Sequence, residues 1–261
     1  MKKVKEIIEV METLAPTFLK EDFDNVGLMV GDREKEVKKV LLALDCTLKV
    51  VEEAKENNVD LIITHHPLIF RRPNNITTDT IQGRKIIELI KNDISLYSSH
   101  TNLDSAKSGL NDSIPKLLGY DSSEILEVNK RDEKAGLGRI VTLDKPTTLD
   151  EIVDNVKKAL NINNLRVVKG KEEVNKIAII NGSGQDFIGK AVSKGADCII
   201  TGDTTYHFAS DYKEMGINII DAGHFASEQI VFFNVMKNII DKFNDVEFIL
   251  SKVEEDPYTF L

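Results

Sequence analysis

Every histidine of this chain stands at the end of an apolar, strand-like run, and an acidic residue follows two of these histidines at a fixed spacing. Histidine is the commonest metal ligand in proteins, and it is the only side chain whose unperturbed pKa lies close to neutrality. Because all copies are confined to such positions, the pattern predicts one polynuclear metal site. The five histidines are His65, His66, His100, His207 and His224.

The first candidate pair is His65 and His66, which precede Pro67. Adjacent side chains on a strand point in divergent directions, so we expect one metal ion to take only one of the two. The pair then suits two ions, or one ion and one supporting group. The alternative is a loop in which Pro67 ends strand pairing and the imidazoles hydrogen-bond to the backbone.

Two further pairs combine an imidazole with a carboxylate four residues later: His224 with Glu228, and His100 with Asp104. At the start of the predicted helix after His224, this spacing brings both side chains onto one face, as in other paired helical ligands. The alternative for the first pair is a helix-capping histidine beside a solvated Glu228. For Asp104 the alternative is a helix cap or an Asx-turn.

The donor types narrow the chemistry of the predicted site. Imidazole and carboxylate without thiolate match Zn, Fe, Mn, Co or Ni better than a structural cysteine-type zinc site, and they leave the identity of the metal open. Cys46 and Cys198 lie far apart, and Cys198 falls in an apolar run where a buried, inert thiol is expected. A carboxylate such as Glu228 can bridge two ions about 3.5–4 Å apart and so activate water, which predicts hydrolysis.

Three other segments are weaker candidates. Residues 24–28 (Asp-Asn-Val-Gly-Leu) are typical of a turn. Residues 201–203 (Thr-Gly-Asp) precede His207 and remain a candidate without an assigned role. Residues 182–184 (Gly-Ser-Gly) resemble a phosphate-binding turn, but a third spaced glycine and a Walker lysine are missing, so we expect a tight turn between a strand and a helix.

The apolar pattern predicts a scaffold in which strand ends converge. Strand-like runs alternate with helical periodicity, which is typical of βαβ units and a largely parallel sheet, and residues just past the carboxyl ends of such strands face the ligand crevice. We expect strands at 40–44, 61–64, 95–98, 136–143, 165–168, 177–180, 198–201, 218–220 and 246–250. We expect helices at 48–57, 83–91, 149–160, 187–194 and 228–243.

The two halves of the chain resemble each other. Residues 39–64 align without a gap, at an offset of 137, with residues 176–201, and His100 with Asp104 matches His224 with Glu228 at an offset of 124. Duplication explains this similarity, and the alternative is that α/β proteins reuse similar strands. If the halves are duplicates, their sites would face one shared cleft.

Charge and length place the chain among ordinary globular proteins. We expect two similar α/β domains with mainly parallel sheets, at 1–125 and 126–261, with the boundary near 121–134 and the charged run 130–134 as a linker. The net charge of -9 and the absence of a basic stripe argue against nucleic-acid binding. The sequence shows no signal peptide and no apolar run long enough to span a membrane, so we expect a cytoplasmic protein.

Several motifs together resemble one known family. They are Phe23-Asp24-Asn25-Val26-Gly27-Leu28, Thr64-His65-His66-Pro67, His100-Thr101-Asn102-Leu103-Asp104, Thr201-Gly202-Asp203 with His207, and Gly223-His224 with Glu228. In this order, across nearly the whole chain, they closely resemble the GTP cyclohydrolase 1 type 2 homologue family, also known as NGG-one-interacting-factor-three-like proteins. Two departures are Phe23, where many relatives carry Trp, and a length that leaves no room for the domain that some relatives insert between the halves.

The resemblance implies a set of site residues. Two divalent ions would be held by His65, His66, Asp104, His224 and Glu228, with Glu228 as the bridge. His100 and His207 would be catalytic cleft residues that shuttle protons.

The resemblance also leaves two classes of function open. The first is a dinuclear-metal-dependent hydrolase that opens the guanine ring of GTP or hydrolyses a related nucleotide. The second is a metal-containing regulatory or binding assembly without GTP turnover. The acidic surface offers a triphosphate no positive patch beyond local Lys and Arg residues and the metals.

The resemblance further implies a ring-shaped homohexamer. Indirect support comes from Phe225, Phe232 and Phe233, which add apolar surface beyond the single stripe that a helix at 228–243 needs to face one core. We therefore expect a neighbouring copy of the chain to cover part of that helix.

Overall fold

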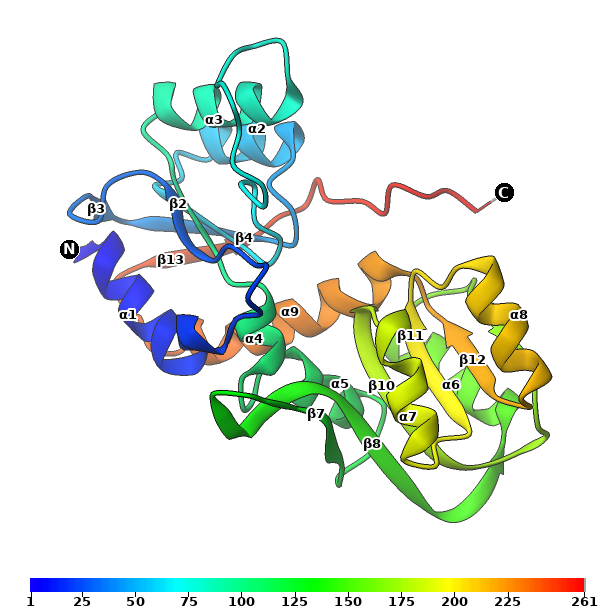
Figure 1. Cartoon of the computed structure of the whole chain (residues 1–261). Coiled ribbons are helices and arrows are strands. Elements are labelled where there is room, and N and C mark those ends of the chain that lie inside the picture. The colour runs from blue at the N-terminus through cyan, green and yellow to red at the C-terminus, as the bar shows by residue number, and fades with distance from the viewer. Residues whose placement is uncertain (261) are drawn as a thin grey trace. The chain divides into compact units, whose positions relative to one another are not determined.

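The chain forms two compact units, and the structure, a computed structural model, describes residues 1–260 (Figure 1). Unit 1 comprises Met1–Asp104 and Phe232–Pro257, and unit 2 comprises Ser105–Val231 with residues 258–260. Each unit contains one large sheet with helices packed on it, so the expected α/β class with two sheet-containing domains is confirmed. Within residues 1–260, none of the helices combines the length and the apolar character that crossing a membrane requires.

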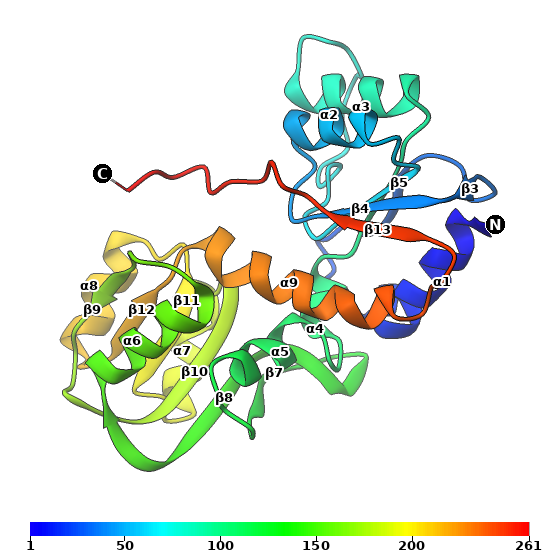
Figure 2. The ribbon, with the colours of Figure 1, turned by 180° about the vertical axis from the view of Figure 1, so that it is seen from behind.

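Unit 1 is built on a five-stranded sheet. The strands of that sheet are β2 (Gly27–Val30), β4 (Lys39–Ala43), β5 (Leu61–Thr64), β6 (Ser95–Ser98) and β13 (Glu247–Leu250), and β1 (Lys2–Lys3) and β3 (Glu36–Val37) form a separate two-stranded antiparallel sheet. The helices of the unit include α1 (Val4–Leu14), η1 (Thr17–Leu19), α2 (Leu48–Glu56), α3 (Ile81–Lys91) and α4 (Thr101–Ser105). The sheet order is β13-β4-β5-β6-β2, and only β2 runs antiparallel to its neighbour. Helices α2 and α3 lie on one face of the sheet and α1 on the other (Figures 1 and 2). Leu41, Ile62 and Leu96 form a buried core with Val50 and Leu89 of these helices.

Unit 2 is built on a six-stranded sheet with the order β7-β8-β10-β11-β12-β9. Its strands are β7 (Glu124–Asn129), β8 (Asp132–Thr148), β9 (Arg166–Val168), β10 (Glu173–Ser183), β11 (Cys198–Gly202) and β12 (Asn218–Asp221), and its helices are α5 (Leu110–Leu117), α6 (Leu149–Leu160), η2 (Gln185–Phe187), α7 (Ile188–Ser193), α8 (Tyr206–Glu214) and the start of α9 (His224–Ile240). β10, β11 and β12 are parallel and form the centre. Antiparallel pairs with β8 and β9 flank that centre, and β7 pairs antiparallel with β8 at the edge.

Three helices begin with the same capping device. The hydroxyls of Thr47, Thr80 and Thr148 accept a hydrogen bond from the backbone N–H three residues later, at the start of α2, α3 and α6. Such a cap satisfies one of the N–H groups that a helix start leaves without an internal partner. The sequence therefore fixes where these helices begin, and with them the lengths of the strand-to-helix connections.

The repeat that the sequence indicates is also present in the structure. Asp60, just before β5, accepts a hydrogen bond from the backbone N–H of Lys39 at 3.1 Å. At the offset of 137, Asp197 just before β11 accepts one from the backbone N–H of Lys176, also at 3.1 Å. The same carboxylate in each unit thus ties two neighbouring parallel strands together, which supports duplication over chance reuse of a strand.

The boundary between the two units lies at a different place from the predicted one near 121–134. The charged run at 130–134 is not a linker, because Lys130 and Arg131 form the turn of a hairpin in which Asn129 of β7 pairs with Asp132 of β8. The chain instead changes unit after Asp104, and the segment from Phe232 onward belongs to unit 1. The last predicted strand, seen as β13, pairs with β4 of unit 1.

The phenylalanines of α9 are less exposed than the predicted interface with a neighbouring copy requires. Phe232 is fully buried. Its ring lies 6.0 Å from that of His65 and 5.8 Å from that of Phe233, all within unit 1. It therefore adds no surface for a neighbouring copy, whereas Phe225 and Phe233 remain half-buried.

Candidate metal centre

Three histidines of unit 1 come together in one group. One ring nitrogen from each of His65, His66 and His100 lies within 4.8 Å of the others, so the three could hold one ion. The ring centroids of His65 and His66 are 5.1 Å apart, and those of His65 and His100 are 5.2 Å apart. β5 ends at Thr64, so the alternation of side chains along a strand does not fix the direction of either ring, and the expectation that one ion takes only one of the two histidines stays a prediction.

Each ring in this group is held through its Nδ1 atom. Nδ1 of His65 lies 2.9 Å from the backbone oxygen of Ser99, and Nδ1 of His66 lies 3.0 Å from Oδ1 of Asp45. Nδ1 of His100 lies 2.9 Å from Oδ1 of Asp24. A carbonyl or an ionised carboxylate can only accept, so Nδ1 must donate in all three contacts. In a neutral ring the Nε2 atom then carries the lone pair, which is the form that binds a metal.

A carboxylate stands next to this group. Asp104 lies in α4 and is buried, and its Oδ1 is 3.7 Å from Nε2 of His65. The backbone N–H of Asp104 donates to the backbone oxygen of His100 at 3.0 Å, which makes the spacing of four a helical one. Asp104 therefore faces the imidazole of His65, as predicted, and the alternative of a helix cap or an Asx-turn is wrong because Asp104 lies within α4.

Asp24 is a buried anchor. Its carboxylate accepts hydrogen bonds from Nδ1 of His100 and from the backbone N–H and hydroxyl of Thr101. Burial raises the pKa of this carboxyl, but the hydrogen bonds from His100 and Thr101 and the electrostatic interaction with His100 outweigh burial and hold the pKa at about 2. Asp24 thus stays ionised and acts as a permanent acceptor for His100, a more specific role than the turn that the sequence predicted.

Unit 2 carries a second imidazole–carboxylate pair. His224 is the first residue of α9, and its Nε2 lies 3.0 Å from Oε2 of Glu228 one turn later. Glu228 is only 4% exposed, so the alternative of a solvated glutamate is wrong. Nδ1 of His224 lies 2.7 Å from Oδ2 of Asp203, which fixes the same tautomer as in unit 1.

Two backbone features shape this pair. Asp203 has a φ of 57°, a left-handed conformation that few residues other than glycine adopt, and it aims its carboxylate at His224 from the end of β11. Gly182 has a φ of 61°, and a Cβ atom there would lie 2.1 Å from Oε1 of Glu228. The Gly-Ser-Gly turn is therefore a strand-to-helix turn, as expected, and its first glycine makes room for the glutamate.

The remaining candidates lie outside these groups. His207 is exposed on α8, and none of the metal-type groups found in residues 1–260 includes it. Burial raises the pKa of the Cys46 thiol to about 12 and also raises that of Cys198. Both thiols are buried and stay protonated at neutral pH, so they are poor metal ligands.

The donor sets in both units fit a divalent transition-metal ion. In the neutral rings, with Nδ1 donating, Nε2 of His65 and Nε2 of His224 each place a lone pair opposite a carboxylate oxygen, at 3.7 and 3.0 Å. A cation between them relieves this repulsion. Ligand atoms that each lie about 2.0–2.2 Å from one ion are separated by about 2.8–3.6 Å, which includes the 3.0 Å of unit 2 and lies close to the 3.7 Å of unit 1.

Sequence reasoning missed Asp45 and the packing role of Gly182. Asp45 follows the end of β4 as closely as His66 follows the end of β5, so the rule applied to the histidines would have found it. The contact between Gly182 and Glu228 has no sequence signal beyond the glycine itself, because it joins residues that are distant in the chain.

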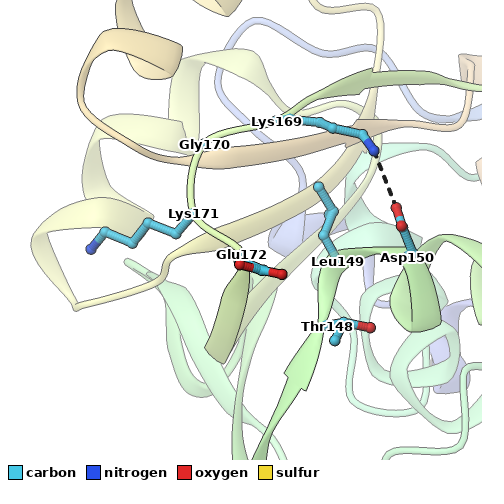
Figure 3. Close-up of a pocket in the computed structure, with 7 residues that line it drawn as sticks. All are labelled: Thr148, Leu149, Asp150, Lys169, Gly170, Lys171 and Glu172. Atoms are coloured by element: carbon cyan, nitrogen blue, oxygen red, sulfur yellow. Dashed lines mark hydrogen bonds and ion pairs between the residues drawn. The ribbon is translucent and has the colours of Figure 1, made fainter.

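A separate cavity lies in unit 2 away from these residues. Its volume is about 370 Å³, and an ion pair between Lys169 and Asp150 at 3.3 Å crosses one side of it (Figure 3). Its lining residues are Thr148, Leu149, Asp150, Lys169, Gly170, Lys171 and Glu172. None of the predicted site residues is among them, so the candidate chemistry does not lie in this cavity.

Comparison with known proteins identifies relatives over the whole chain. A GTP cyclohydrolase 1 type 2 homolog of Clostridium perfringens is 57% identical over 261 residues, which cover 99% of this chain and 100% of the relative. The crystal structure of a hypothetical protein of Staphylococcus aureus has a TM-score of 0.90 and 31% identity, with 99% of each chain covered. The structure of reduced HcgD from Methanocaldococcus jannaschii has a TM-score of 0.84 and 36% identity, and covers 95% of this chain and 97% of that one.

The family itself is defined by a sequence profile. The profile described as Duf34/NIF3 (NGG1p interacting factor 3) matches residues 2–257. This match, the relatives and the shared fold agree with the resemblance that the motifs carry. The chain belongs to the DUF34/NIF3 family.

Proposed function

We propose that the chain binds two divalent transition-metal ions and uses them to hydrolyse a nucleotide. The ligands would be His65, His66 and Asp104 in unit 1, and His224 and Glu228 in unit 2. The metals that suit these donors are Zn, Fe, Mn, Co and Ni.

The observation that carries this proposal is the common tautomer of the four buried or half-buried histidines. Each gives its Nδ1–H to a fixed acceptor and keeps the Nε2 lone pair. Metal-binding histidines in proteins are oriented in this way by a carboxylate or a carbonyl. Histidines of a packed core have no reason to share one tautomer, so the regularity favours ligation.

Residues around the proposed ions would have different roles in the reaction. Bound ions supply Lewis acidity and activate water for hydrolysis. Asp24, Asp45 and Asp203 hold the rings of their histidines in place through Nδ1. His100 lies in the imidazole group, and its Nδ1–H is fixed by Asp24, so its Nε2 atom is the one that would take up and return a proton. We propose His207, on exposed α8, as a second proton carrier that acts with a bound substrate.

The proposed substrate is GTP or a related nucleotide. Support comes from the name GTP cyclohydrolase 1 type 2 homolog that the Clostridium perfringens relative bears. The corresponding reaction would be hydrolytic opening of the guanine ring by attack at C8.

The test is a substrate screen on reconstituted protein. Purified chain would be stripped with chelator, loaded separately with Zn, Fe(II), Mn, Co and Ni, and incubated with GTP and other nucleotides while the ultraviolet absorbance of the base is followed. We expect one metal to give turnover that Glu228→Ala abolishes. Equal turnover by Glu228→Ala would contradict the proposal, since Glu228 is a proposed ligand.

A binding or regulatory assembly is the alternative function. It retains the proposed metal sites but lacks turnover. A wild-type chain that binds two ions and leaves every nucleotide of the screen unchanged would establish this alternative over the hydrolase.

We propose further that the chain assembles as a homohexamer, which the family resemblance implies. Half-buried Phe225 and Phe233 offer apolar surface on α9 for a neighbouring copy, although fully buried Phe232 does not. Light scattering at micromolar concentration should give about six times the chain mass of 29.3 kDa. A monomer mass at all concentrations would remove the hexamer and leave the metal sites untouched.

A further inference from the structure

Two aromatic rings of unit 1 are left in solvent beside the imidazole group. Phe23 is 69% exposed and Phe70 is 42% exposed. The two rings stand edge to face, with centroids 6.3 Å apart. Phe70 is also edge to face with His100 at 6.2 Å, so this aromatic pair continues directly from the imidazole group.

Both rings sit on tethered backbone. Asp24, next to Phe23, is buried and held by His100 and Thr101, so Phe23 points outward from a fixed residue. Ile69, next to Phe70, accepts a hydrogen bond through its backbone oxygen from Nδ2 of Asn25 at 2.6 Å. This bond joins the segment that carries Phe23 to the segment that carries Phe70. The pair is therefore preorganised, which lowers the entropic cost of binding a ring against it.

Positive charge follows the aromatic pair in the chain. Arg71 and Arg72 come directly after Phe70, both are exposed, and no ion pair engages either guanidinium within residues 1–260. Two residues span at most about 7 Å of chain, so both arginines begin close to the Phe70 ring. Arginine side chains are well suited to phosphate because their planar N–H groups form paired hydrogen bonds with its oxygens.

We propose that Phe23, Phe70, Arg71 and Arg72 form a subsite for a planar heteroaromatic ring that carries a phosphate group. The ring packs against the two phenylalanines, and the arginines bind the phosphate. Through Phe70 and His100 the subsite delivers such a ligand to the imidazole group. The inference deepens the proposed function and rests on it for the reaction, whereas ligand binding at this subsite does not require a metal.

Ligand-observed saturation-transfer NMR on the full chain tests this subsite, with GMP as probe. Guanosine lacks the phosphate and ribose 5-phosphate lacks the ring, so the pair separates the two contributions. The measurement is made both in chelator and after metal loading. If the proposed metal function fails, the loaded protein will hold no metal. If the subsite fails, the protein will not bind GMP in chelator.

We expect GMP to bind and to show saturation transfer from the protein to the proton of its purine ring. Phe23→Ala and Phe70→Ala should each weaken this binding about tenfold. Phe18→Ala is the matched control, because Phe18 is 54% exposed and makes no ring contact among the described residues. Phe70→Trp should retain binding. Arg71→Ala with Arg72→Ala should weaken GMP but not guanosine, and Arg33→Ala, another exposed arginine, should change neither.

Three results would overturn the subsite. The first is an unchanged affinity for GMP in Phe70→Ala. The second is an equal effect of Phe18→Ala, which would mean nonspecific contact with exposed rings. The third is a change of assembled mass in Phe70→Ala by light scattering, which would assign the aromatic pair to an interface between copies of the chain.

Discussion

The two units share a scaffold but differ in the ligands they carry. Unit 1 groups three imidazoles with one carboxylate, and its His65 is fully buried. Unit 2 has one imidazole with one carboxylate, and its His224 side chain is 34% exposed. The strand, helix and strand that precede both groups are nevertheless tied by equivalent bonds from Asp60 and Asp197.

The difference shows how a repeated strand end has taken two roles. At the offset of 137, His65 and His66 correspond to Gly202 and Asp203. In unit 1 this position supplies candidate ligands, whereas in unit 2 Asp203 anchors the ring of His224. His100, the counterpart of His224, takes its anchor from Asp24 near the N-terminus. The scaffold thus conserves the place of the chemistry while the residues there change function.

The largest expected effect is the loss of metal on Glu228→Ala. Unit 2 has only two proposed ligands, and the resemblance implies that Glu228 bridges both ions, so this variant should lose both. Metal content after purification without chelator is the measurement, with Glu214→Ala, an exposed glutamate of α8, as the control. Full metal content in Glu228→Ala would show that the bridging assignment is wrong.

Gly182→Ala should act on the same carboxylate without removing it. A Cβ at Gly182 would meet Oε1 of Glu228 at 2.1 Å, so the carboxylate must shift, and we expect the affinity for metal to fall about 10–100-fold. Gly119→Ala is the control, because Gly119 also has a positive φ, of 84°, but nothing lies within 4 Å of its Cβ position. Both variants should lose about 1 kcal/mol of unfolding free energy from backbone strain. Equal metal affinities in zinc titrations of the two would contradict the contact.

The anchoring carboxylates should have a smaller effect. Asp203→Asn keeps the left-handed backbone accessible but removes the charge that supports His224. We expect about tenfold weaker zinc binding. Asp45→Asn in unit 1 should cost less, because His65 and Asp104 remain as proposed ligands in that unit. Calorimetric titration checks the order, and a greater loss in Asp45→Asn would reverse the comparison.

The smallest effect concerns the segment of unit 1 that follows β13. Oε1 of Glu254 accepts the backbone N–H of Asp45 at 2.8 Å, and burial raises the pKa of this carboxyl to about 7. The folded state therefore binds more protons than the unfolded state between about pH 4.5 and pH 7, and stability falls as pH rises through that window. Glu254→Gln should stabilise the chelated chain at pH 8 and not at pH 4. Urea unfolding at both pH values measures this, and equal changes would assign the effect to something other than ionisation.

Local signals predicted single elements well. Helix α6 has the expected bounds, because Thr148 and Glu151 form a capping box at its start and Asn161 ends it in a left-handed conformation. The run at 130–134 misled because charge alone does not distinguish a hairpin turn from a linker. The unit to which β13 belongs could not be predicted, since its pairing with β4 joins opposite ends of the chain.

The candidate site was predictable in its residue types but not in its geometry. Imidazoles and carboxylates at strand ends were visible in the sequence, and unit 1 brings His65, His66, His100 and Asp104 together. The shared tautomer, the approach of Gly182 to Glu228 and the exposed Phe70 ring depend on contacts between distant residues. Side-chain orientation beyond the end of a strand follows from tertiary structure, so periodicity carries no information about it.

The central claim, that the two ligand groups together bind two ions per chain, is tested most directly by the metal content of the wild-type chain. Protein purified without chelator, reconstituted with Zn and dialysed against metal-free buffer would be analysed by mass spectrometry of the elements. The account predicts two ions per chain in native-like protein. A metal content near zero under these conditions would contradict it.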